Sequence, residues 1–164
     1  MGSDKERIPL ADSIEKLAVR LERAMHGLIG ELQGIGDAEL YTPPAEGEWS
    51  VAQACAHVVE MEVLWMSKAA NLAEQPDIAR TEEEVERRLV EIDGHARDAL
   101  DTIVQRLRDG NEQALGILRG MRPADLERPG TLRGSQTGRQ VIERVVIEHI
   151  EEHAAQVAEA RGGE

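Results

Sequence analysis

The sequence contains few aromatic residues: its 164 residues include no phenylalanine, one tyrosine and two tryptophans. Alanine, glutamate, leucine and arginine dominate instead. Because aromatic side chains favour strands and these abundant residues favour helices, the composition predicts an all-α protein. A chain of this length can bury one substantial core. We therefore expect a single helical domain over residues 1–164, with flexible ends at 1–9 and 161–164.

Cysteine and long apolar runs are also scarce. Cys55 is the only cysteine, which excludes a disulfide within the chain, and we interpret it as a small packed residue. No apolar run approaches the roughly 20 residues that span a bilayer. The charged start of the chain, Met1–Arg7, is not followed by an apolar signal region. These features predict a cytoplasmic protein without a membrane partner.

Basic residues are outnumbered: lysine and arginine total 19, aspartate and glutamate total 32, and the formal net charge is −13. Nucleic acids and anionic membranes attract proteins through basic patches. The charge therefore argues against both as partners and leaves a small-molecule substrate as the expected ligand.

Apolar residues at helical spacing predict four long helices, at about 11–33, 50–73, 97–121 and 137–160, and a short one at about 82–93. One continuous helix over 82–121 would measure roughly 60 Å, so we place a break at Gly94. Three helix starts carry a capping-box pattern, in which a hydroxyl residue precedes Gln or Glu by three positions. These pairs are Ser50 with Gln53, Thr81 with Glu84, and Thr137 with Gln140.

Two histidines four residues apart, His149 and His153, fall on the predicted buried face of the last helix. The predicted face steps by 4, 3, 4, 3 and 4 residues through Ile142, Val146, His149, His153, Gln156 and Ala160. A buried polar group without a partner costs about 1–3 kcal/mol. Because neutral imidazoles one turn apart can point at one ion, a divalent metal is the simplest partner.

His57 lies on an apolar face of the second long helix, together with Ala54, Met61 and Leu64. If the two helices pack side by side, His57, His149 and His153 can share one ion. Three protein ligands leave positions open for water or substrate, as in catalytic sites. The alternative is that each histidine is hydrogen-bonded within an ordinary core. His26 and His95 lie at the flanks of their helices, where we expect surface or boundary positions.

Two carboxylates and a tryptophan lie close in sequence to the predicted ligands. Glu60 or Glu148 could accept the second ring N–H of a ligating imidazole, since such ligands usually have a partner there. Trp49 is interpreted as a plug at the end of the bundle rather than a substrate-binding residue.

The Trp49-Ser50 helix start, His57 in that helix, and the H-x-x-x-H pair His149 and His153 together resemble the DinB/YfiT-like superfamily. The resemblance extends from the first helix to Gln156. It implies a four-helix bundle with a long-crossover connection, one divalent metal bound by the three histidines, and a homodimer. Relatives of known chemistry include transferases and isomerases that use bacillithiol, mycothiol or glutathione. Residues 75–97 are longer than this family leads one to expect.

These observations lead to three hypotheses. The first is a metal-dependent enzyme, either a low-molecular-weight-thiol-dependent transferase or a hydrolase, with zinc or nickel preferred and iron or manganese as alternatives. The second is a non-catalytic module in which the metal is structural or sensory. The third is a metal-free helical dimerisation protein. No catalytic residue outside the triad can be assigned from the sequence.

Overall fold

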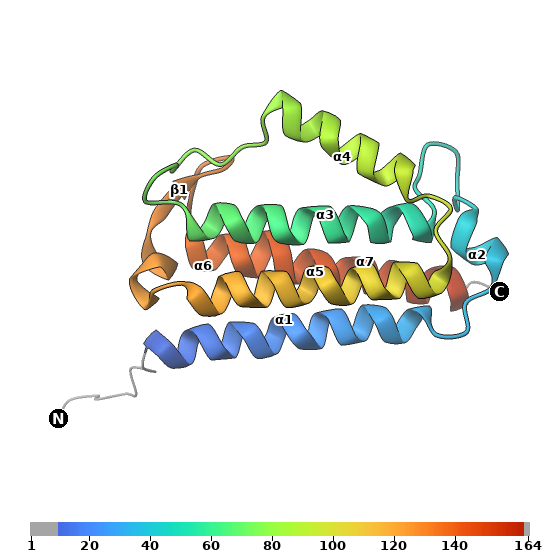
Figure 1. Ribbon diagram of the computed structural model, residues 1–164, viewed down its shortest axis with the longest axis horizontal. Coiled ribbons are helices and arrows are strands. Elements are labelled where there is room, and N and C mark those ends of the chain that lie inside the picture. The colour runs from blue at the N-terminus through green and yellow to red at the C-terminus, as the bar shows by residue number, and fades with distance from the viewer. Residues whose placement is uncertain (1–9, 163–164) are drawn as a thin grey trace.

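The structure, a computed structural model, describes residues 10–162 (Figure 1). Within this range four long helical segments form a bundle: α1 (Leu10–Leu32), α3 (Val51–Ala70), α5 (Leu100–Gly120) and a continuous last helix made of α6 (Gly138–Gln140), the π-helical segment η2 (Val141–Ile147) and α7 (Glu148–Gly162). Shorter elements connect them: α2 (Asp37–Tyr41), α4 (Glu82–Gly94), the 3₁₀ helix η1 (Pro123–Glu127) and the strands β1 (Pro129–Thr131) and β2 (Ser135–Thr137).

The order of the bundle follows from its packing. Helix α1 packs on α5 and α7, whereas α3 packs on α5 and η2. Helices α3 and α5 run in the same direction, because the connection between them carries α4 back along the outside of α3 (Figure 1). This arrangement confirms the predicted all-α bundle with a long crossover and an extra short helix.

Apolar stripes on the helices form the core. The apolar stripe of α1 is buried at every position: Ile14, Leu17, Leu21, Ala24, Leu28 and Leu32. Helix α5 contributes Leu107, Ala114 and Leu118, which are fully buried. Removing this apolar surface from water is the main term that stabilises the bundle. The core also fixes the direction in which each helix presents its polar residues.

Two of the three predicted capping boxes form completely. Ser50 and Gln53 exchange both hydrogen bonds, at 3.1 and 2.9 Å, and Thr137 and Gln140 do the same. At the start of α4 the hydroxyl of Thr81 accepts from the Glu84 N–H. The Glu84 carboxylate, however, pairs with Lys68 at 2.8 Å instead of turning back to the cap. The predicted reciprocal half of this box is therefore wrong.

Several elements differ from the sequence prediction. Helix α2, the β1–β2 hairpin and the π-helical character of η2 were not predicted. Residues 161 and 162 belong to α7, and Arg161 donates a hydrogen bond to the Glu31 carbonyl. The flexible ends predicted at 1–9 and 163–164 lie outside the described residues. Within residues 10–162, no helix combines the length and apolar character that crossing a lipid bilayer demands.

Candidate metal centre

The two histidines of α7 present their rings to the bundle interior one above the other. His149 and His153 are separated by one helical turn. Their rings stack, with centroids 4.7 Å apart and planes inclined by 13°. His153 is 8% exposed, and His149 is half-buried. The spacing predicted from the sequence therefore gives a paired set of imidazoles on one helix face.

His57 approaches this pair from α3. Its ring is 5% exposed, and its centroid lies 5.3 Å from that of His149 and 5.8 Å from that of His153. One ring nitrogen from each of the three histidines lies within 4.8 Å of the other two. Small side-chain rotations would bring such nitrogens around one ion, so the cluster can hold a metal.

Unpaired ring nitrogens support this fit. Both ring nitrogens of His153 are buried without a hydrogen-bond partner among the described residues, whereas Nδ1 of His57 has the Glu60 carboxylate beside it, at 3.5 Å. Buried polar atoms are usually satisfied, and each exception calls for an explanation. The hypothesis that ordinary core hydrogen bonds satisfy all three imidazoles is therefore weaker for His153 than for the other two. A metal ligated by the cluster would satisfy one ring nitrogen of His153.

The electrostatic environment favours neutral imidazoles. Burial, followed by the neighbouring His149 and His57, lowers the pKa of His153 to about 4. Burial and His57 also lower the pKa of His149. Because only the neutral ring can donate a lone pair to a metal, both residues stand ready as ligands at neutral pH.

An ion pair supports the ring of His57. The Glu60 carboxylate lies 3.5 Å from His57 Nδ1 and is held by a two-pronged interaction with Arg80, whose second nitrogen donates at 3.0 Å. Burial acts to raise the pKa of Glu60, but His57 and Arg80 outweigh it and hold that pKa below its usual range. Of the two predicted partner carboxylates, Glu60 is beside an imidazole, whereas Glu148 is exposed.

Arg80 was missed by sequence reasoning. It lies in the long connection between α3 and α5, and its guanidinium carbon sits 5.6 Å from the ring centroid of Trp65. No motif or spacing relates Arg80 to Glu60, twenty residues earlier. The connection formed by residues 75–97 thus has a structural role, because it places a cation against the carboxylate beside His57.

The π-helical segment η2 ends directly before α7, and the residues that the last helix buries differ in part from the predicted stripe. Ile142 and Val146 are buried as predicted, but Gln156 and Ala160 are exposed. The buried stripe instead continues through Ile150, His153 and Val157. The predicted stripe is therefore wrong beyond His153, because the last turns of α7 border a pocket rather than the core. Single π turns within helices often occur at functional sites.

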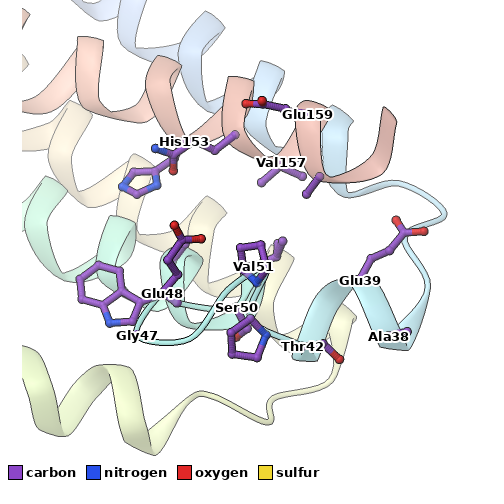
Figure 2. A pocket seen from close by; sticks show the side chains of 16 residues that line it. Ala38, Glu39, Thr42, Gly47, Glu48, Ser50, Val51, His153, Val157 and Glu159 are labelled. Atoms are coloured by element: carbon purple, nitrogen blue, oxygen red, sulfur yellow. The ribbon is translucent and has the colours of Figure 1, made fainter. Parts of the chain in front are cut away.

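This pocket, of about 970 Å³, opens beside His153 between the end of α7 and the segment that joins α2 to α3 (Figure 2). Trp49 lines it, is 37% exposed, and places its ring centroid 4.9 Å from that of His57. Trp49 thus lies between the pocket and the ring of His57, and its interpretation as a plug at the end of the bundle stays a prediction. The structure therefore joins a potential metal centre to a space that a small molecule can enter.

The remaining candidates lie where the sequence predicted. His26 is exposed, and His95 is half-buried and pairs with Asp98 at 2.7 Å. Cys55 is packed in the core, and burial raises the pKa of its thiol to about 12. A thiol with that pKa is inert at neutral pH. Cys55 is therefore neither a ligand nor a nucleophile of this centre.

One of three comparisons with known proteins found a match. Comparison with curated proteins and comparison with solved structures each found no match. The sequence pattern of the DinB superfamily, in contrast, matches residues 20–157, which include all three histidines and most of the bundle. A match over this much of the chain, together with the long-crossover bundle, leads to one conclusion: the chain belongs to the DinB superfamily.

Proposed function

We propose that His57, His149 and His153 bind one divalent metal ion and that the protein is a metal-dependent enzyme, a transferase that uses a low-molecular-weight thiol. The observation that carries the proposal is the convergence of three imidazoles, with unpaired buried ring nitrogens, beside a pocket. Membership of the DinB superfamily supports the metal. The transferase activity rests on the resemblance to thiol-using relatives.

The residues of the centre have distinguishable roles in this proposal. The three neutral imidazoles would hold the ion, which when bound would lower the pKa of a coordinated thiol or water. Glu60, fixed by Arg80, orients the ring of His57. Trp49 separates the cluster from solvent on the pocket side. The pocket would receive the second reactant within reach of His153.

Three protein ligands rather than four favour an open site over a purely structural one. The pocket beside His153 supports the same choice, because a structural or sensory metal needs no entry for a small molecule. A metal-assisted hydrolase would use the same residues and is the second candidate. Imidazole ligands suit zinc, nickel, copper and iron, so we propose zinc or nickel first and keep iron and manganese as alternatives. A homodimer and a cytoplasmic location stay predictions.

The metal is tested first by its amount in the purified protein. We expect close to one equivalent in the wild-type protein and near-complete loss in His57→Ala, because two remaining imidazoles form a much weaker site. His26→Ala, which removes an exposed histidine, is the matched control and should keep the metal. Equal metal content in the wild-type protein and in His57→Ala would contradict the proposed ligand set.

The activity is tested on metal-loaded protein with a panel of thiols, including glutathione, mycothiol and bacillithiol, and a common electrophile. We expect metal-dependent consumption of thiol that is absent in His153→Ala. Metal binding without thiol transfer across the panel, accompanied by ester or amide hydrolysis, would favour the hydrolase. Metal binding with neither reaction would favour the structural or sensory module.

A further inference from the structure

We propose that Gln156 is a positioning residue of the metal centre, whose side-chain amide oxygen accepts the N–H of the His153 ring nitrogen that does not bind the ion. The inference rests on the proposed function, because it deepens the account of the same site. It adds a residue outside the three ligands and outside the Glu60–Arg80 pair that supports His57.

One ring nitrogen of His153 needs a partner even when the cluster binds an ion. Each histidine of the cluster offers one ligand atom, yet both ring nitrogens of His153 are buried without a partner among the described residues. A neutral imidazole that binds a metal carries a proton on its other nitrogen, and this N–H usually donates to a nearby acceptor. Because His153 is only 8% exposed, that acceptor has to come from the protein or from an ordered water.

The neighbours of His153 on its own helix leave one candidate. Residues three and four positions apart lie next to each other on a helix surface. For His153 these neighbours are His149, Ile150, Gln156 and Val157. His149 is itself a proposed ligand, and Ile150 and Val157 have no hydrogen-bonding side chain. Gln156 is therefore the one neighbour of the four whose side chain can accept the N–H.

The place of the Gln156 side chain fits this role. Gln156 lines the pocket beside His153. Burial is the largest influence on the pKa of His153 and lowers it, whereas the Gln156 side chain acts in the opposite direction as a hydrogen-bond partner. The amide is therefore beside the ring, although it does not complete a hydrogen bond to either nitrogen. Because Gln156 is exposed and its side-chain bonds can rotate, its oxygen can close this gap.

Glu48 is the competing acceptor on the opposite side of the pocket. Figure 2 shows its carboxylate facing His153. Glu48 does not pair with either ring nitrogen of His153, and no carboxylate is among the groups that act on the pKa of this ring. The amide of Gln156 is thus favoured over the carboxylate of Glu48. A hydrogen bond from the ring to Gln156 fixes the tautomer of His153, so that its other nitrogen presents a lone pair to the ion.

Zinc affinity tests the inference, measured by competition with a chromogenic chelator. Gln156→Met keeps a side chain of similar length and removes the acceptor, so we expect zinc binding to weaken by about tenfold. Gln156→Glu supplies an acceptor oxygen again and should bind zinc at least as tightly as the wild-type protein. Gln113→Met, which changes an exposed glutamine of α5 outside the pocket, is the matched control and should keep the wild-type affinity.

Nitrogen-15 NMR of the histidine rings separates positioning from a general loss of structure. In the wild-type protein we expect the ring N–H of His153 to exchange slowly with water, both with zinc and after treatment with a chelator. Gln156→Met should lose this slowly exchanging signal, and Gln156→Glu should retain it. The ring N–H of His57, which faces Glu60, should be unchanged in both variants.

In protein that binds zinc, both effects are required. If either the affinity or the His153 signal is unchanged in Gln156→Met, the inference fails and the metal centre stands. A loss of affinity in Glu48→Ala with none in Gln156→Met would assign the partner to Glu48 and overturn the inference as well. If the wild-type protein binds neither zinc nor nickel, the His153 signal alone decides: its dependence on Gln156 would support the inference while the proposed function fails, and its independence would overturn both.

Discussion

At the scale of single residues, the ion pair of Arg80 and Glu60 links the long crossover connection to the ring of His57. Carboxylates that hold ligating histidines raise metal affinity by about 10- to 100-fold. We expect Arg80→Gln to weaken metal binding by about tenfold, because Glu60 would lose the partner that fixes it. Competition with a chromogenic chelator measures the change.

Arg87→Gln is the control for Arg80→Gln, since Arg87 is an exposed arginine of α4 that pairs with Glu83 and not with Glu60. Glu60→Gln should weaken binding to a similar extent, because it removes the charge beside His57. An affinity unchanged in both Arg80→Gln and Glu60→Gln would show that the ring of His57 is held by packing alone.

Glu62 is a buried carboxyl of α3 that plays no part in the metal centre. It is fully buried, neither of its oxygens has a hydrogen-bond partner among the described residues, and burial raises its pKa from 4.5 to about 8. The folded protein therefore keeps a proton there that the unfolded chain releases above about pH 4.5. By linkage, the stabilising contribution is complete below pH 4.5 and is lost as the pH rises to about 8.

We expect the free energy of unfolding of the wild-type protein to fall by on the order of 2 kcal/mol between pH 6.5 and 8 through Glu62. Glu62→Gln cannot titrate and should lack this decline. Urea unfolding at several pH values measures it, and Glu112→Gln, an exposed carboxylate, should keep the wild-type slope. The same decline in Glu62→Gln would assign the effect to other groups.

At the scale of secondary-structure elements, replacement by alanine should have opposite effects on stability at two glycines. Gly116 lies in α5, and a Cβ added there meets no atom within 4 Å. Gly138 begins α6, where a Cβ would lie 2.7 Å from the backbone oxygen of Asp125. The first site offers open space in a helix, whereas the second is closed by the η1 backbone.

We expect Gly116→Ala to raise the free energy of unfolding by about 0.5–1 kcal/mol, because alanine loses less entropy on entering a helix. Gly138→Ala should lower the free energy of unfolding, since the η1 segment must move to admit the methyl group. Thermal unfolding of the two variants, followed by circular dichroism, compares them directly. A rise in the melting temperature of both variants would show that the η1 backbone moves at little cost to admit the methyl group.

The long helices and their caps were predictable because their signals are local. Helical spacing of apolar residues and the Ser50 and Thr137 boxes lie within single elements. The β1–β2 hairpin was not predictable: its strands have three residues each and are joined to a distant segment by the bridge between Asp77 and Thr131. The π-helical turns of η2 also escaped, because nearly continuous apolar residues fit several helix types.

In the candidate site, too, local patterns were predictable from the sequence and contacts between distant segments were not. His57, His149 and His153 could be named because each lies on an apolar face and the family pattern orders them. Arg80, the exposure of Trp49 and the pocket depend on how the crossover connection and the segment before α3 fold over the bundle. Such contacts join residues whose positions in the sequence carry no shared pattern.

At the scale of the whole molecule, the three histidines come from α3 and α7, helices that are far apart in the sequence and pack against each other. A ligand that binds the folded state alone stabilises it by about 4 kcal/mol at a thousandfold excess over its dissociation constant. We expect removal of the metal by a chelator to lower the melting temperature of the wild-type protein. The melting temperature of His57→Ala should not respond to the chelator. A wild-type protein equally insensitive to chelation would contradict a metal that bridges the two helices.

The π-helical segment η2 has a consequence for how this bundle tolerates insertions and deletions. A π turn absorbs one residue more than an α turn while the helix continues beyond it. Deletion of the exposed Arg144 would let the segment resume ordinary α-helical bonding, with the helix start at Thr137 and the imidazoles of α7 still in phase with the core. The distance in sequence between the cap and the first histidine of this chain can therefore shorten by one residue while the three imidazoles keep their places.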